Sequence, residues 1–190
     1  MVVTDLLTLF ERSVDEFGRR VRAVSDDQWD SPTPDEGWTV RDLVQHLVSE
    51  ELWAPPLLAG STIEDVGDRL DGDLVGDDPK AAWEAAARAA VDAAHADAPL
   101  SRTVHVSFGE ISAEEYLTQL TADHTIHAWD LARAIGADET LDPELVELAY
   151  ESLEPQIEQW RGAGIFGAKV EPPEGASRQV RLLALTGRAV

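Results

Sequence analysis

The stretch 123–133, DHTIHAWDLAR, lies in a longer segment with apolar residues at helical spacing, and it places ligand-type side chains among core residues. Asp123 and His127 stand four residues apart, so on a helix they lie one turn apart on the same face. A second stretch, 39–50, TVRDLVQHLVSE, presents His46 in a similar setting. A carboxylate and two imidazoles from two facing helices would give a divalent metal three ligands and leave one position open, as catalytic sites require. The two stretches therefore predict a helical protein with a metal site between helices.

Asp123 and His127 fall on the stripe of their helix that should face the interior. At about 100° per residue, Asp130 lies within about 60° of Asp123, whereas His124 lies about 100° away, at the edge of the stripe. An ionised carboxylate buried alone is costly, so such groups normally pair with another charge or bind a metal. The alternative to a metal site is a hydrogen-bonded histidine–carboxylate network that orders the core.

On the other helix, the same count places Glu50 and Trp53 near His46. His46 and Glu50 alone are a weak metal-ligand pair, because Glu50 could equally be an exposed carboxylate or one that supports a ligand. Tryptophans are more often core anchors than substrate platforms. Trp53 and Trp129 are the two that lie close enough in sequence to the candidate ligands to matter.

The rest of the chain also favours helices, and neither βαβ alternation nor an internal repeat is present. Pro55 and Pro56 are expected to end the second helix, and residues 60–79 are expected to form a long surface loop that could contain a short turn of helix. Residues 103–108 alternate like a short strand, which predicts a small hairpin or an extended connection. The fold class is therefore all-α, a bundle of four main helices with extra short helices and at most a small β-hairpin. The expected helices span 4–24, 39–54, 80–96, 112–135 and 143–160.

Composition limits the function classes. The 190 residues suit one domain spanning 1–190, and the absence of cysteine excludes disulfides, thiolate metal sites and a cysteine nucleophile. The first residues resemble no secretory signal, and no apolar run is long enough to span a membrane, so a soluble cytoplasmic protein is expected. The formal charge of −22 makes this an acidic protein whose surface would repel nucleic acid and anionic lipid.

Through the two stretches that contain His46 and His127, the chain resembles the DinB-like four-helix metalloproteins. It is most similar to an actinobacterial branch that includes the metal-binding domain of mycothiol-dependent maleylpyruvate isomerase. The resemblance covers nearly the whole chain. The matching stretches are GWTVRDLVQHLV (37–48), ELWAPPLLAG (51–60), HAWDLARAIG (127–136), GIFGAKV (164–170) and RLLALTGR (181–188).

The resemblance implies an up-down bundle that holds a metal between its helices, commonly zinc and in some members nickel or iron. The family ligands, one histidine from the second helix and a pair at i, i+4 from a later one, match His46, Asp123 and His127. The isomerase has glutamate in place of Asp123, and the shorter arm could shift the metal or leave room for a water. The isomerase also has a separate C-terminal domain, and this chain ends without one. We therefore expect the fold and the metal site to transfer better than the isomerase activity.

The first functional hypothesis is a metal- and thiol-dependent transferase or isomerase. A low-molecular-weight thiol such as mycothiol would bind the metal, lose its proton and attack an electrophilic carbon. This chemistry needs no cysteine in the protein. Arg133 could orient an anionic substrate, although a helix-surface salt bridge is its ordinary alternative role.

Two other hypotheses stay open. In a metal-dependent hydrolase the nucleophile would be water activated by the metal, with Glu50 or Asp130 as the general base. A non-enzymatic metal-binding or stress-associated protein would use the same ligands without turnover. A small-molecule substrate or thiol is the expected partner in the enzyme hypotheses, and a homodimer formed through an exposed helix face is compatible with all three.

Overall fold

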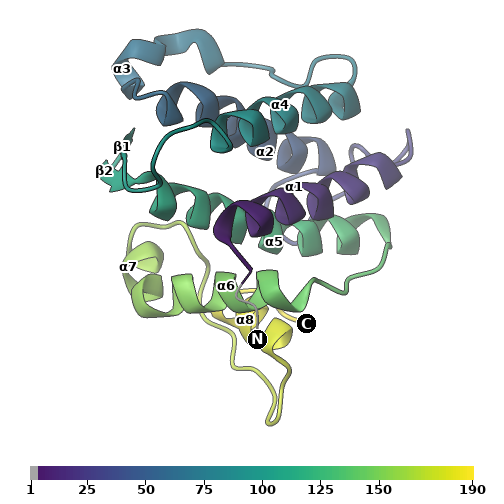
Figure 1. Cartoon of the computed structure of the whole chain (residues 1–190). Helices are drawn as coiled ribbons and strands as arrows, with labels where there is room; N and C mark the ends of the chain where they lie inside the picture. The colour runs from purple at the N-terminus through teal and green to yellow at the C-terminus, as the bar shows by residue number, and fades with distance from the viewer. Residues whose placement is uncertain (1–3) are drawn as a thin grey trace.

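The computed structural model of the chain describes residues 4–190 (Figure 1). Residues 1–3, part of the stretch read for a secretory signal, lie outside the described residues. Helix α1 packs against α4 and α5, and α2 packs against the same two helices, so that four helices enclose the core. This arrangement confirms the predicted all-α bundle. The four helices are α1 (Leu6–Ala23), α2 (Val40–Leu58), α4 (Pro79–Ala94) and α5 (Ala113–Ile135).

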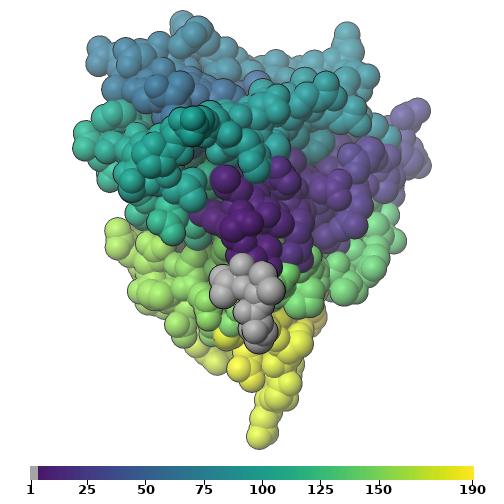
Figure 2. All heavy atoms as spheres, in the orientation of Figure 1, coloured from purple at the N-terminus to yellow at the C-terminus, as the bar shows by residue number. Residues whose placement is uncertain are grey.

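Shorter elements cover the ends and one side of this bundle. Helix α6 packs against the outer side of α5 and against α8, and Figure 2 shows the loop before α8 projecting from that end of the molecule. The predicted hairpin is present, with β1 and β2 antiparallel. No helix within residues 4–190 has the length and apolar character needed to cross a membrane. The shorter elements are α3 (Ile63–Val66), η1 (Gly67–Leu70), β1 (Thr103–Val106), β2 (Gly109–Ser112), α6 (Pro143–Leu153), η2 (Glu154–Gln156), α7 (Ile157–Gly162) and α8 (Arg178–Leu185).

The starts of the two ligand-bearing helices are set by local hydrogen bonds. Thr39 accepts from the backbone N–H of Asp42, and the Asp42 carboxylate accepts from the backbone N–H of Thr39. This capping box satisfies two backbone donors that the first turn of α2 would otherwise leave unpaired. Ser112 caps α5 by accepting from the N–H of Glu115, and Gly136 ends that helix in the left-handed conformation. Both helix starts follow the sequence prediction.

The predicted end of α2 is wrong, because the helix continues through Pro55 and Pro56 to Leu58. Proline removes a backbone donor and crowds the preceding turn, yet its fixed φ is helical. Here both prolines lie in the last turn, and their carbonyls still accept from the N–H groups of Ala59 and Ser61. The added turn buries Leu58 in the core, which offsets the lost bonds.

The predicted single helix over 143–160 is also wrong. Helix α6 ends at Leu153, and the turn η2 and the short α7 follow it. Pro155 explains the break, because it lacks a donor and its ring would meet the carbonyl of Glu151 in a continuous helix. The break turns α7 out of line with α6, and both segments then contribute to the pocket described below.

Gly18 tests how tightly α1 packs against α4. A Cβ at this position would lie 2.8 Å from the indole Nε1 of buried Trp83. Alanine improves helix propensity by about 1 kcal/mol, whereas overpacking a core costs about 1–3 kcal/mol. We therefore expect Gly18→Ala to lower the free energy of unfolding by about 1 kcal/mol, measured by urea denaturation. The control is Gly162→Ala in α7, where the added Cβ meets no atom within 4 Å. Unchanged or higher stability of Gly18→Ala would contradict this packing.

Candidate metal centre

Helices α2 and α5 bring the three predicted ligands together. The Nε2 atom of His46 lies 3.1 Å from Asp123 Oδ2, and the Nε2 atom of His127 lies 3.4 Å from Asp123 Oδ1. One ligand atom from each of the three residues lies within 4.8 Å of the other two. The carboxylate of Asp123 thus stands between the two imidazoles, and its short side chain reaches both of them.

These distances fit a divalent metal. Ligands bound tetrahedrally at about 2.0–2.2 Å stand about 3.3–3.6 Å apart, close to the separations that involve Asp123 here. Two imidazoles and one carboxylate form a donor set suited to zinc and related ions. The chemistry and spacing of His46, Asp123 and His127 therefore fit the implied metal with one position left for another ligand.

A buried ionic network orients His127 from behind. Its Nδ1 lies 2.9 Å from Asp130 Oδ2, and because a carboxylate only accepts, Nδ1–H is the donor. Asp130 is fully buried and accepts two hydrogen bonds from Arg188, at 3.1 and 2.7 Å. Arg188 also donates to Asp35 at 2.8 Å. With Nδ1 engaged in this way, Nε2 of His127 faces the site, as a metal-binding histidine requires.

Trp38 packs against the imidazole rings of His46 and His127. Its ring stacks on His127 with centroids 6.1 Å apart and lies tilted against His46 at 5.2 Å. The residue follows Gly37 in the short connection before α2, so the start of that helix positions it. These ring contacts limit the rotation of both imidazoles.

The electrostatics of the cluster favour positive charge. Burial opposes protonation, yet Asp123 and Asp130 together raise the pKa of His127 to about 10. Burial acts to raise the pKa of Asp123, but His127 and His46 hold it well below its ordinary value. The same negative groups that retain a proton on His127 would stabilise a divalent cation in its place.

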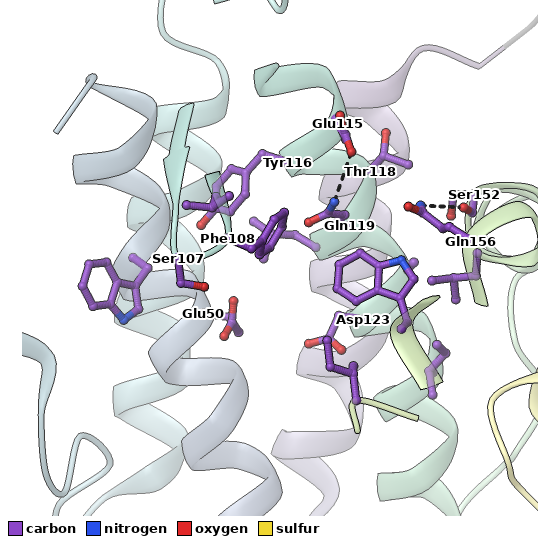
Figure 3. A pocket seen from close by; sticks show the side chains of 18 of the residues that line it. Glu50, Ser107, Phe108, Glu115, Tyr116, Thr118, Gln119, Asp123, Ser152 and Gln156 are labelled. Carbon is purple, nitrogen blue, oxygen red and sulfur yellow. Dashed lines mark hydrogen bonds between the residues drawn. The ribbon is translucent and has the colours of Figure 1, made fainter. Parts of the chain in front are cut away.

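A cavity of about 640 Å³ opens beside the ligands, between α2, α5, the hairpin and the segment from α6 to residue 166. His46 and Asp123 form part of its wall, together with mainly apolar side chains. Figure 3 shows Glu50 and Asp123 facing the same space from α2 and α5. A small organic molecule in this cavity would therefore lie next to the open metal position.

The other candidate residues occupy different surroundings. Glu50 and Trp53 line the cavity, whereas Asp130 lies behind His127 with its oxygens bonded to His127 and Arg188. Trp129 is buried in the core. Arg133 lies outside the cavity wall, pairs with Glu139 at 2.9 Å and stacks over Trp129. This placement matches the surface salt bridge named as its alternative role.

Sequence reasoning missed a second buried pair. His124 and Glu51 are both fully buried, with Nε2 of His124 2.6 Å from Oε1 of Glu51, and His124 Nδ1 lies 3.2 Å from the Ser13 hydroxyl. The expectation that His124 lies at the edge of the buried stripe is thus wrong. Helix α5 has neighbours on both sides, so residues beyond a single stripe are buried. Together with Ser13, the pair connects α1, α2 and α5.

Known proteins match both the sequence and the fold. The family model described as the mycothiol maleylpyruvate isomerase N-terminal domain matches residues 10–132. Proteins described as uncharacterized in two strains of Mycobacterium tuberculosis are each 34% identical over 192 residues, covering 98% of this chain and 99% of the relative. The three ligand residues lie within the range matched by the family model, whereas Arg188 lies beyond it.

Crystal structures of mycothiol-dependent maleylpyruvate isomerase and of a histidine-to-alanine mutant of it resemble this chain. Their TM-scores are 0.65 and 0.67, respectively, at 19% identity over 89% of this chain and 75% of theirs. At this identity the likeness shows a shared fold, which is the DinB-like bundle.

Replacing Asp130 tests whether the buried network supports metal binding. Asp130→Asn keeps the shape but removes the charge that orients and polarises His127. Because such supporting contacts typically contribute a factor of about 10–100 to metal affinity, we expect the dissociation constant for zinc to rise by that factor. Competition with a chromophoric chelator would measure it, with circular dichroism to confirm folding. The control is Glu139→Gln, which removes only the surface pair with Arg133. Equal zinc affinity in wild type and Asp130→Asn would contradict the role assigned to Asp130.

Proposed function

The chain belongs to the family of the mycothiol maleylpyruvate isomerase N-terminal domain, and from this premise we propose that it is a divalent-metal-binding, thiol-dependent transferase or isomerase. One observation carries the proposal: ligand atoms of His46, Asp123 and His127 converge, and two of these residues, His46 and Asp123, line an apolar cavity. Zinc is the preferred metal for this donor set, with nickel or iron as alternatives. Mycothiol is the thiol suggested by the family.

A divalent metal held by these three residues would lower the pKa of a thiol at its open position, so that the sulfur is anionic at neutral pH. His46 and His127 bind as neutral imidazoles, and Asp123 brings one negative charge. One positive charge of a divalent ion then stays uncompensated, which favours an anionic sulfur as the fourth ligand. Since the chain has no cysteine, this sulfur would come from a small-molecule thiol.

Glu50 is placed to handle the proton. Its carboxylate lines the cavity beside Asp123, and burial together with the negative charge of Asp123 raises its pKa. In an isomerisation, a carboxylate Oε of Glu50 would accept the thiol proton and return it once the carbon–sulfur bond breaks. In this proposal Glu50 is the acid–base group. Asp130 is the positioning residue for His127, because Asp130 has no access to the cavity.

The walls of the cavity would protect this chemistry from water. Trp38 packs against both imidazoles, and the hairpin residue Phe108 lines the cavity together with Asp123 (Figure 3). An apolar enclosure strengthens the attraction between the ligands and a cation, because it lowers the local dielectric constant. It also favours attack by a bound sulfur over attack by water.

Metal content tests the foundation of the proposal. We expect about one equivalent of metal per chain of wild type by mass spectrometry, and its loss in His127→Ala, which removes one of three ligands. His95→Ala is the matched control, because His95 lies on the surface and pairs with Glu11 at 2.5 Å. Wild type that takes up no metal even after reconstitution would reduce the cluster to a structural network and leave the enzyme proposal without support.

Cobalt substitution tests the role of the thiol. If sulfur occupies the open position, adding mycothiol to the cobalt protein should produce an intense sulfur-to-cobalt absorption band, absent with the corresponding alcohol. Turnover of electrophilic substrates should then depend on the thiol. Ester or amide cleavage without thiol, together with no spectral change, would favour the hydrolase alternative, in which Glu50 serves as the base.

A further inference from the structure

We propose that the cavity beside the ligands admits an uncharged, apolar organic molecule, aromatic or similar in character, as the acceptor for the thiol. The inference rests on the proposed function for the identity of the reaction, but the binding preference follows from the walls of the cavity alone. It names the substrate class and excludes anionic substrates.

The walls are rich in aromatic side chains from separate parts of the chain. They come from α2, the hairpin, α5, α7 and the loop after α7, and they surround the space above Asp123. A planar apolar molecule would find ring faces and edges on several sides, the arrangement that binds such ligands well. These aromatic residues are Trp53, Phe108, Tyr116, Trp160 and Phe166.

The carboxylates that line the cavity oppose an anion, and the one histidine of the lining within residues 4–190, His46, is paired with Asp123 at 3.1 Å. The wall contains the carboxylates of Glu50, Glu115 and Asp123, and within residues 4–190 the lining includes no lysine or arginine. The same histidine is assigned to the metal. Moving a carboxylate ligand into an apolar space without a cationic partner is costly, and nearby like charges add to the cost.

Two arginines near the ligands in the sequence or the fold are held elsewhere. Arg133 pairs with Glu139 and stacks on Trp129, outside the cavity wall. Arg188 is buried between Asp130 and Asp35 on the far side of His127. Moving Arg188 toward a substrate would leave two buried carboxylates without their partner, so it belongs to the fixed structure.

The entrance is apolar as well. Ile63, Phe108 and Ile165 are among the few large apolar side chains that the fold leaves exposed, and all three line this cavity. Phe108 also contacts Trp160 edge-to-face with centroids 5.7 Å apart, so the hairpin meets α7 across the opening. Exposed apolar groups gathered at one opening mark a site that binds apolar partners.

The substrate-facing wall and the ligands have different origins in the sequence. The ligands lie within residues 10–132, the range that the family model matches. The wall from Ser152 to Phe166 lies beyond that range. Family membership therefore supports the ligand set more strongly than it supports a particular substrate, because the choice of substrate also depends on the wall formed by residues 152–166.

Three probes of similar shape differ in charge. Methyl 2-naphthoate is neutral, 2-naphthoate is an anion and 2-naphthylmethylammonium is a cation. Isothermal titration calorimetry on metal-free protein, without thiol, would measure their affinities, because an open metal position would itself bind a carboxylate. We expect the ester to bind at least tenfold more tightly than the carboxylate, and more tightly than the ammonium ion. A carboxylate that binds as well as the ester to the metal-free protein would overturn the proposal. Preferred binding of the ammonium ion, or no binding of the ester, would overturn it equally.

Two variants locate the binding. Phe108→Ser should weaken ester binding at least threefold, whereas Val190→Ser, which alters an equally exposed apolar residue outside the cavity, should leave it unchanged. Equal effects of the two variants would place the ester elsewhere and contradict the inference. Because no thiol is present, failure of the cobalt or turnover experiments would refute the proposed reaction without changing these affinities. Conversely, tighter binding of 2-naphthoate than of the ester would refute the proposed substrate class but not the proposed reaction.

Discussion

Asp130 is a fully buried carboxylate, and the architecture of the site depends on how its charge is compensated. His127 and Arg188 supply the compensation, and Arg188 in turn holds Asp35. The network thus joins the connection before α2, the middle of α5 and the segment after α8, three regions far apart in the sequence. Removing any one partner would leave a buried charge unpaired, which costs far more than an exposed ion pair contributes. The orientation of the His127 imidazole is therefore coupled to the closure of the fold.

Local patterns were sufficient for the bundle but not for the ends of its helices. The capping box at Thr39 and the glycine at 136 act within one turn, so the sequence predicts them directly. A proline does not fix the end of a helix in the same way. Pro55 and Pro56 lie in a final turn, where few backbone bonds are lost and a leucine gains burial, whereas Pro155 lies where a continuous helix would need its donor. Which case applies depends on tertiary packing that no local pattern contains.

The site, like the fold, was predictable where it depends on one helix and not where it depends on contacts between distant segments. The spacing of Asp123 and His127 is a property of one helix. The polar residue His46 on the inward face of a second helix indicated the third ligand, and the resemblance to a known family supported this assignment. The rest of the network behind His127 could not be read in this way, because Asp35 and Arg188 are separated by 153 positions. His124 was misplaced because an angular count assumes a single buried face. Helix α5 lies between α1 and α2 on one side and α6 on the other, so it is buried over most of its circumference.

The negative charges in and next to the ligand cluster and the apolar walls of the neighbouring cavity would affect what binds there in different ways. The negative charges of Asp123 and Asp130 would attract a cation to the ligand cluster, and the apolar surroundings would reduce the screening of that attraction by water. A metal held by three residues has one open position, for which an anionic substrate and an anionic sulfur would compete. Under the proposed function, a cavity that excludes anionic organic molecules would remove this competition and leave the position to the thiol. An uncharged acceptor held against the aromatic walls would then meet the sulfur without displacing it.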